Sequence, residues 1–319
     1  MSMHGPLCLG IDTSCYTTSV ACTDGKSIVF SKGTMLSVAF GDRGLRQSEG
    51  LFQHVKQLSP LLCELFSAVD RTAIACVSVS ASPTSAENSY MPVFLAGLKQ
   101  AETLAAALDV PLIRTDHQSG HIRAALFGNE TLLDRERFFS VHISGGTTDL
   151  LLVEPHRDAP YRIEPVGCST DLHAGQFVDR VGVALSLPFP AGKHLEALAL
   201  QAEKKDVKLP SAVKGLNCSF SGAESAAQRL LHTVPDAELS YGVYDCLART
   251  LSKMFADAVQ TYGELPFLVC GGVASSQLLR TLLKKRFSGK LYFGKPELSR
   301  DNAVGVALLG ADRGILWNR

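Results

Sequence analysis

Residues 7–32, LCLGIDTSCYTTSVACTDGKSIVFSK, contain three β-type runs in a row, and this order decides the fold. The runs are Leu7–Asp12, Thr18–Thr23 and Ser27–Lys32, with Asp24-Gly25 as the turn between the last two. Apolar and β-branched residues bounded by short polar turns are typical of strands that pair with their chain neighbours. The stretch therefore predicts an antiparallel β-meander.

The same order recurs in the second half of the chain. Three more β-type runs are Phe138–Ser144, Thr148–Glu154 and Tyr161–Val166, with Gly145-Gly146 at the first turn. After the first meander, hydrophobic spacing predicts helices at Gly44–Val69 and Met91–Leu108 and strands at Ile74–Ser80 and Pro111–Thr115. After the second, it predicts helices at Leu172–Leu185, His194–Lys205, Leu239–Tyr262, Ser276–Phe287 and Asn302–Trp317, and strands at Phe267–Cys270 and Leu291–Phe293.

A meander followed by helices and strands, met twice, predicts an α/β protein of two related lobes facing each other across a cleft. We place the lobes at residues 1–115 and 116–319, and the last helix can pack back on the first lobe. The length of 319 residues favours two lobes, because it exceeds the usual limit of one compact core. A single mixed sheet is the alternative topology.

The composition is that of a globular protein with no overall charge. Hydrophobic residues make up 46% and charged residues 19%, which excludes a disordered or fibrous chain. The 31 basic residues balance 31 acidic ones, so no net field attracts nucleic acid or an anionic membrane. Contact with RNA would therefore need a local basic patch or a partner protein.

Cysteine usage and the N-terminus indicate the compartment. Nine cysteines form no CxxC pair and lie mostly in apolar runs, as free thiols in a reducing compartment do. The start of the chain lacks a basic region followed by an apolar stretch, and no 18 apolar residues run together. We expect a cytoplasmic protein that does not interact with membranes.

Two histidines in the segment DHQSGH (residues 116–121) are candidate metal ligands. His117 and His121 are four residues apart, so both imidazoles project from one face of a helical turn. Neutral imidazoles suit Zn²⁺ or Fe²⁺, and Asp301, just before the last helix, is the candidate carboxylate that completes the site. Alternatively, the histidines are exposed helix residues and Asp301 is a helix N-cap.

Two glycine turns are candidate phosphate-binding loops. Ser144-Gly145-Gly146-Thr147 follows a strand, and its glycines let backbone N–H groups curl toward a phosphate oxygen. Gly271-Gly272 follows a buried strand and leads into a helix, as nucleotide sites of α/β folds often do. Ordinary hairpins are built in the same way, so each turn alone is a weak signal.

Other chemistry-bearing residues give a mixed picture. Asp179 on a predicted helix is suited to hydrogen bonds from a ribose or from a metal-bound water, or it lies on a solvated helix face. Ser219 and Ser221 lie near a bend, but no histidine and acid are arranged around them as in a serine hydrolase. The sequence also lacks an HExxH motif. A peptidase is therefore not supported.

Eight motifs, in order and nearly from end to end, resemble those of the universal tRNA threonylcarbamoyladenosine synthase family, formerly named O-sialoglycoprotein endopeptidases. They are LGIDTSC (9–15), DHQSGH (116–121), ISGGTT (143–148), FVD (177–179), PAG (190–192), CSFSG (218–222), GGVA (271–274) and DNA (301–303). The resemblance implies the fold of actin, sugar kinases and Hsp70. It also implies transfer of a threonylcarbamoyl group from its adenylate to adenosine 37 of tRNA.

The resemblance further implies the ligands and their residues. A divalent zinc or iron ion would be held by His117, His121 and Asp301 and would contact the phosphate of ATP or an acyl-adenylate. The nucleotide would be bound by Ser144, Gly145, Gly146, Thr147, Asp179, Gly192, Gly271, Gly272 and Ser276. Expected partners are tRNA, the proteins of the same pathway that make the adenylate and support turnover, and a second subunit in a dimer.

Several positions depart from the family pattern. Tyr16-Thr17 stands where the family has Asp-Glu, Gln176 replaces a glutamate, and Glu224 replaces a lysine. Ser276 replaces an asparagine and Thr147 a histidine, and Ala81-Ser82-Pro83-Thr84 replaces a glycine-proline-glycine turn. The resemblance therefore implies a divergent paralogue. Two alternatives to tRNA modification stay open, namely an acyl or carbamoyl transferase with a non-RNA acceptor and a non-catalytic partner or scaffold.

Overall fold

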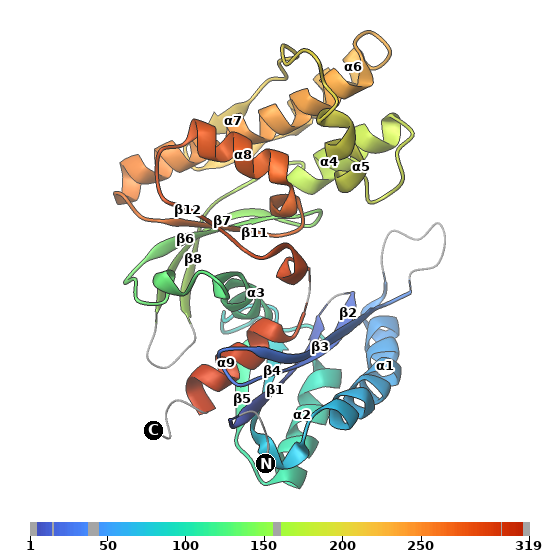
Figure 1. The fold of residues 1–319 in the computed structure, drawn as a ribbon, viewed down its shortest axis with the longest axis vertical. Coiled ribbons are helices and arrows are strands. Elements are labelled where there is room, and N and C mark those ends of the chain that lie inside the picture. The colour runs from blue at the N-terminus through green and yellow to red at the C-terminus, as the bar shows by residue number, and fades with distance from the viewer. Residues whose placement is uncertain (1–4, 15, 38–44, 156–160, 301, 315–319) are drawn as a thin grey trace. The chain divides into compact units, whose positions relative to one another are not determined.

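A computed structural model describes residues 5–14, 16–37, 45–155, 161–300 and 302–314, which divide into two compact units (Figure 1). One unit contains the chain up to Phe127, Tyr161 and the segment from Arg300 onward. The other contains Gly128–Pro155 and Arg162–Ser299. Each unit has its own five-stranded sheet, so the alternative of a single mixed sheet is wrong.

The first sheet has the strand order β3-β2-β1-β4-β5. Its strands are β1 (Leu7–Ser14), β2 (Thr17–Thr23), β3 (Ile28–Met35), β4 (Ile74–Ser82) and β5 (Leu112–Asp116). Antiparallel pairing joins β1, β2 and β3, which confirms the predicted meander, while β4 runs parallel to β1 and β5 parallel to β4. The helices of this unit are α1 (Gln47–Ala68), α2 (Phe94–Leu108), α3 (His117–Leu126) and α9 (Val304–Gly314).

Successive side chains of β1 contact different helices, which shows which helices cover each face of this sheet. Leu9 and Ile11 belong to an apolar cluster with residues of α1 and α2. Cys8 instead packs with Ala311 of α9, and a Cβ on Gly10 would lie 2.6 Å from the backbone nitrogen of Ala307. Because successive side chains of a strand point to opposite faces, α9 covers one face and α1 and α2 the other (Figure 1).

The second sheet repeats this plan with the order β12-β11-β6-β7-β8. Its strands are β6 (Phe138–Ile143), β7 (Thr148–Pro155), β8 (Tyr161–Cys168), β11 (Phe267–Cys270) and β12 (Leu291–Phe293). The first two strands pair antiparallel, and β11 and β12 add in parallel, as β4 and β5 do in the first sheet. Matching strand order in the two units confirms the duplication expected from the sequence.

Five α-helices complete the second unit, namely α4 (Ala174–Ala184), α5 (Gly192–Ala199), α6 (Ser221–Leu230), α7 (Asp236–Tyr262) and α8 (Gln277–Arg286). A small hairpin of β9 (Ala212–Lys214) and β10 (Asn217–Ser219) accompanies them. The core contains a stack of aromatic rings, in which Phe267 lies 4.8 Å from Phe139 and 4.5 Å from Phe255 between ring centroids. Such offset pairs add to the stability that apolar burial provides.

The main differences from the predicted elements lie in residues 199–230. The predicted helix His194–Lys205 ends at Ala199, because the residues that follow bury no continuous helical face: Leu200 and Gln201 are exposed, as are Glu203–Lys205. The hairpin and α6 were not predicted from the sequence. Only two small side chains of α6, Ala223 and Ala227, are buried, so its apolar stripe is too narrow to show the helical period.

None of the described helices is a candidate membrane span. Within the described ranges, no helix combines the length and the apolar composition needed to cross a bilayer.

His54 on α1 is a buried group whose protonation opposes folding. Thr18 donates its hydroxyl hydrogen to Gln57 (2.7 Å), so it accepts from the Nδ1–H of His54 (2.8 Å). Burial lowers the pKa of His54 to about 4, against the opposing charge of Asp12. Between these pKa values, His54 is protonated in the unfolded chain, where the pKa of a histidine is near 6.5, but stays neutral in the folded chain.

We expect His54 to destabilise the protein as the pH falls from about 6.5 toward 4, by about 1–2 kcal/mol at pH 5 relative to pH 8. Urea unfolding at both pH values measures this loss. In His54→Asn, which keeps a polar group near Thr18 but does not titrate, the loss should be smaller by that amount. Equal losses of stability in the wild type and in His54→Asn would show that His54 has the same pKa in the folded and the unfolded chain.

Candidate functional site

The start of α3 positions the two candidate metal-binding histidines. Asp116, the last residue of β5, caps the helix by accepting hydrogen bonds from the N–H (2.8 Å) and the hydroxyl (2.6 Å) of Ser119. His117 and His121 then lie one turn apart on α3, with their rings edge to face at 4.4 Å between centroids. Their Nε2 atoms are 3.0 Å apart. The expected convergence of the imidazoles is therefore present.

Asp12 in the middle of β1 fixes the orientation of the first imidazole. Its carboxylate is completely buried, and Oδ2 lies 3.1 Å from Nδ1 of His117. Ser14 donates to the same oxygen (2.9 Å), and the Ser80 hydroxyl donates to the other. A carboxylate at Nδ1 holds the proton on that nitrogen and leaves the lone pair on Nε2. His117 therefore presents the lone pair of Nε2 toward His121.

The paired nitrogens suit a divalent ion in spacing and chemistry. Two nitrogen ligands of one tetrahedral Zn²⁺ stand about 3.3 Å apart, given Zn–N bonds of about 2.0–2.1 Å. The observed 3.0 Å needs only a small change in ring orientation. The described residues contain no cluster of three or more metal-binding side chains, and Asp301, the predicted third ligand, lies outside them.

A direct backbone contact holds α9 against the helix that bears the histidines. A Cβ on Gly305 would lie 1.8 Å from the carbonyl oxygen of Gly120 and 2.9 Å from the nitrogen of Ala124. Asn302 caps α9, because its side-chain oxygen accepts from the N–H of Val304 (3.0 Å). The start of α9 is thus fixed beside the second turn of α3.

The turn Ser144–Thr147, in the second unit, joins β6 to β7 and closes on itself. Ser144 donates its N–H to the carbonyl of Thr147 (2.9 Å). The Ser144 hydroxyl accepts from the N–H groups of Gly146 (3.2 Å) and Thr147 (3.1 Å). Gly145 and Gly146 are exposed, and a Cβ on either would meet open space. A phosphate at this turn would compete with the Ser144 hydroxyl for two donors.

The second glycine turn lies beside the first. Gly271 follows β11 with φ +97°, and a Cβ on it would lie 2.4 Å from the carbonyl oxygen of Ile143, the last residue of β6. Because β6 and β11 are parallel neighbours, both turns are at the carboxyl edge of the sheet. Gly175 near the start of α4 also donates its N–H to the carbonyl of Ser144 (3.0 Å). Ligands of α/β proteins bind at such strand ends.

The remaining predicted residues have identifiable local contacts. Asp179 on α4 accepts from the N–H of Ala191 (2.8 Å), just before Gly192, and burial raises the pKa of its carboxyl group. Gly192 accepts from the hydroxyl of Tyr244 (2.8 Å). The hydroxyl of Ser276 caps α8 by accepting from the N–H of Leu279 (3.1 Å). Gly272 follows Gly271, and a Cβ on it would meet open space.

Residues that depart from the family pattern are used in the local structure. Gln176 accepts from the N–H of His173 at the start of α4 (3.1 Å). Glu224 accepts from the side chain of Gln228, one turn along α6 (3.0 Å), and the Thr147 hydroxyl lies 3.0 Å from that of Ser144. Tyr16 is 43% exposed.

Sequence reasoning gave no role to Asp12. A signal was present, because a carboxylate inside the apolar run Leu7–Ser14 cannot be buried without partners. Those partners come from segments near residues 80 and 117, and the sequence alone does not identify them.

Comparison with known proteins gives consistent results. A profile of the family described as tRNA N6-adenosine threonylcarbamoyltransferase matches residues 50–308. A protein of that description from Carboxydothermus hydrogenoformans is 31% identical, over 97% of this chain and 92% of the relative. Its counterpart from Bacillus licheniformis is 29% identical, over 95% and 90%.

One solved structure supports the fold. The activator of 2-hydroxyisocaproyl-CoA dehydratase from Clostridium difficile, solved with bound ADPNP, matches with a TM-score of 0.56 at 16% identity. The match covers 98% of this chain and 97% of the activator. The α/β fold of actin, sugar kinases and Hsp70, expected from the sequence motifs, is confirmed.

Proposed function

Because this chain belongs to the tRNA N6-adenosine threonylcarbamoyltransferase family, we propose that it transfers a threonylcarbamoyl group from its adenylate to an adenosine of tRNA. The observation that carries the proposal is the pair of Nε2 atoms 3.0 Å apart, one of them oriented by the buried Asp12. Such a pair offers two ligands to one divalent ion.

Zinc or iron would be held by His117 and His121, with Asp301 as the third ligand. When bound, such an ion would supply Lewis-acid polarisation of an acyl-phosphate oxygen. Asp12 keeps the proton of His117 on Nδ1, and hydroxyls of Ser14 and Ser80 hold that carboxylate in place. The chain's own part is thus to hold the Nε2 atoms of the two imidazoles close to one point.

ATP or the acyl-adenylate would bind at the carboxyl edge of the second sheet. The exposed Gly145 and Gly146 have no side chains there to obstruct a phosphate, and Gly271 closes the neighbouring turn. Asp179 offers a carboxylate for hydrogen bonds from ribose hydroxyls, with Gly192 just beyond it. The bound ADPNP in the Clostridium difficile activator supports a nucleotide in this fold.

Other proteins complete the proposed reaction. Partner enzymes have to make the adenylate. We propose that further partner proteins support turnover of this chain, and that it forms a dimer. One observation favours a non-catalytic role instead: Tyr16 and Ser276 replace polar site residues of the family pattern.

A reconstituted assay distinguishes these functions. The purified protein is incubated with unmodified tRNA, threonine, bicarbonate, ATP and the partner enzymes, with the Carboxydothermus relative as positive control. We expect threonylcarbamoyladenosine in the digested tRNA, at a rate within about tenfold to 100-fold of the control, because altered groups around a retained ligand set weaken activity by such factors. No product from this chain, where the control reacts, would overturn the proposed function.

A further inference from the structure

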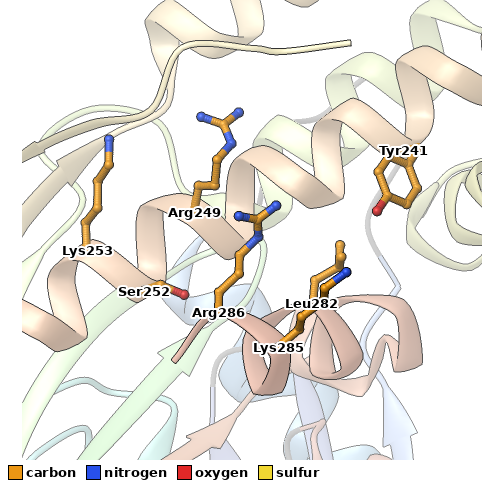
Figure 2. Close-up of a pocket in the computed structure, with 7 residues that line it drawn as sticks. All are labelled: Tyr241, Arg249, Ser252, Lys253, Leu282, Lys285 and Arg286. Carbon is orange, nitrogen blue, oxygen red and sulfur yellow. The ribbon is translucent and has the colours of Figure 1, made fainter. Parts of the chain in front are cut away.

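A cavity of about 390 Å³ lies in the second unit between α7 and α8 (Figure 2). It is lined by Tyr241, Arg249, Ser252, Lys253, Leu282, Lys285 and Arg286. Four of these seven residues are cations, and none is acidic. A lining that is more polar than apolar and rich in charged donors suits a hydrated anion better than an apolar ligand.

The buried Asp245 pairs with both arginines of this basic pocket and with Lys208. Its carboxylate lies 2.8 Å from Nε of Arg249 and 3.2 Å from Nζ of Lys208, and it also pairs with Arg286. Although burial alone raises the pKa of Asp245, the hydrogen bond from Arg249 and the charges of Arg286 and Lys208 lower it overall. One ionised carboxylate therefore faces three cations, which leaves an excess of positive charge.

Two lysines add to that excess. Lys253 donates to the backbone carbonyl of Ser211 (3.0 Å), a contact that fixes its position without neutralising its charge. Within the described residues, neither Lys253 nor Lys285 has a carboxylate partner. The pocket thus combines guanidinium groups held in place with two ammonium groups able to pair with a ligand.

Two hydroxyl groups complete the lining. The Ser252 oxygen is buried and has no hydrogen-bond partner among the described residues. The Tyr241 phenol is a donor at neutral pH, and burial raises its pKa further above the ordinary value. An unpaired buried hydroxyl beside cations is a polar group that a bound anion would satisfy.

We propose that this pocket binds backbone phosphates of the RNA substrate, an inference that rests on the proposed function. The whole chain is neutral, so a polyanionic substrate gains no attraction from the net charge and needs a local basic site. Arginine, lysine and hydroxyl side chains are the usual phosphate-contacting groups of nucleic-acid-binding proteins. The lining has only one aliphatic side chain, Leu282, and one aromatic side chain, Tyr241, so its four cations outnumber its apolar groups.

The test compares two double variants that lose the same charge. Lys253→Ala/Lys285→Ala removes the two ammonium groups and leaves the Asp245 ion pairs intact. Lys284→Ala/Lys290→Ala is the matched control, because both lysines are exposed, close in sequence to the pocket and not part of its lining. The affinity for an unmodified tRNA transcript is measured by fluorescence anisotropy between about 50 and 200 mM salt.

For the pocket variant we expect tRNA binding about tenfold weaker at the lowest salt. The slope of log Kd against log salt should fall by about 1.4–1.8, since each lost phosphate contact removes about 0.7–0.9. The control variant should change affinity less than twofold. Unchanged affinity and slope in the pocket variant overturn the inference.

Two further readouts separate this inference from the proposed function and from a small-anion site. Pocket-dependent tRNA binding by a wild-type protein that transfers nothing supports the inference and overturns the function. Transfer by the wild type with an unchanged tRNA KM in the pocket variant does the reverse. Loss of inorganic pyrophosphate binding in the pocket variant, with tRNA affinity unchanged, overturns the RNA assignment.

Discussion

The variant His117→Ala is expected to lose its bound divalent metal and to transfer threonylcarbamoyl groups at least about 100-fold more slowly than the wild type. His117 supplies one of two nitrogens that lie 3.0 Å apart, and its removal leaves His121 as the remaining imidazole of the pair. Metal content after dialysis, measured by elemental analysis, and the rate of the reconstituted transfer reaction test this expectation.

Asp12→Asn tests the positioning role of the buried carboxylate. Asparagine keeps the size of Asp12 but removes the charge that favours the Nδ1–H form of His117. Loss of such a carboxylate partner costs about tenfold to 100-fold in metal affinity. We therefore expect Asp12→Asn to bind metal more weakly than the wild type but more tightly than His117→Ala. A higher concentration of free metal should restore full occupancy.

His54→Asn is the matched control for both variants, because it alters a buried histidine of the same unit outside the paired imidazoles. It should keep its metal in full. Stoichiometric metal in dialysed His117→Ala would contradict the assignment of this side chain as a ligand, whatever the transfer rate. Metal lost equally from His54→Asn would instead indicate a general effect of destabilisation.

Regular elements with a strong pattern were predictable from the sequence. The strand Phe267–Cys270 has the predicted bounds, because its four buried apolar residues lie between Pro266 and Gly271, which interrupt regular structure. Helix α3 begins directly after Asp116, and its first turns contain the helical turn that was expected for His117 and His121. In these segments, local propensity and tertiary burial favour the same structure.

Contacts between distant segments were not predictable in the same way. The basic pocket joins Arg249 and Lys253 of α7 to Lys285 and Arg286 of α8, and the balanced total charge conceals it. Likewise, the sequence of the Ser144 turn indicates hydroxyls and glycines but not that the Ser144 hydroxyl accepts from its own loop. Rotamers and packing between elements decide such features.

The contact between α3 and α9 is where fold and candidate site depend on each other most directly. A Cβ on Gly305 would lie 1.8 Å from the carbonyl oxygen of Gly120, so α3 and α9 cannot keep their present separation with any other residue at 305. On its other side, α9 packs on β1 and β4, where a Cβ on Gly310 would lie 2.4 Å from Sγ of Cys8. Helix α9 is therefore packed on both sides and cannot shift away from α3 without a clash against the sheet.

Gly305→Ala is expected to destabilise the first unit by about 3 kcal/mol, the upper part of the usual range for overpacking. Displacement of α3 should also lengthen the 3.1 Å contact between Asp12 and His117 and so weaken metal binding. Urea unfolding measures the first effect, hydrogen exchange of α3 and α9 amides locates it, and metal titration measures the second.

Gly222→Ala is the matched control, because Gly222 is also in the first turn of a helix but a Cβ there would meet open space. Its stability should stay equal or rise by up to about 1 kcal/mol, the difference in helix propensity between the two residues. Suppose that Gly305→Ala were as stable as Gly222→Ala and that hydrogen exchange of the α3 amides were unchanged. Helix α9 would then be packed less tightly against α3 than the close backbone contact at Gly305 indicates. The histidine pair would then be independent of α9.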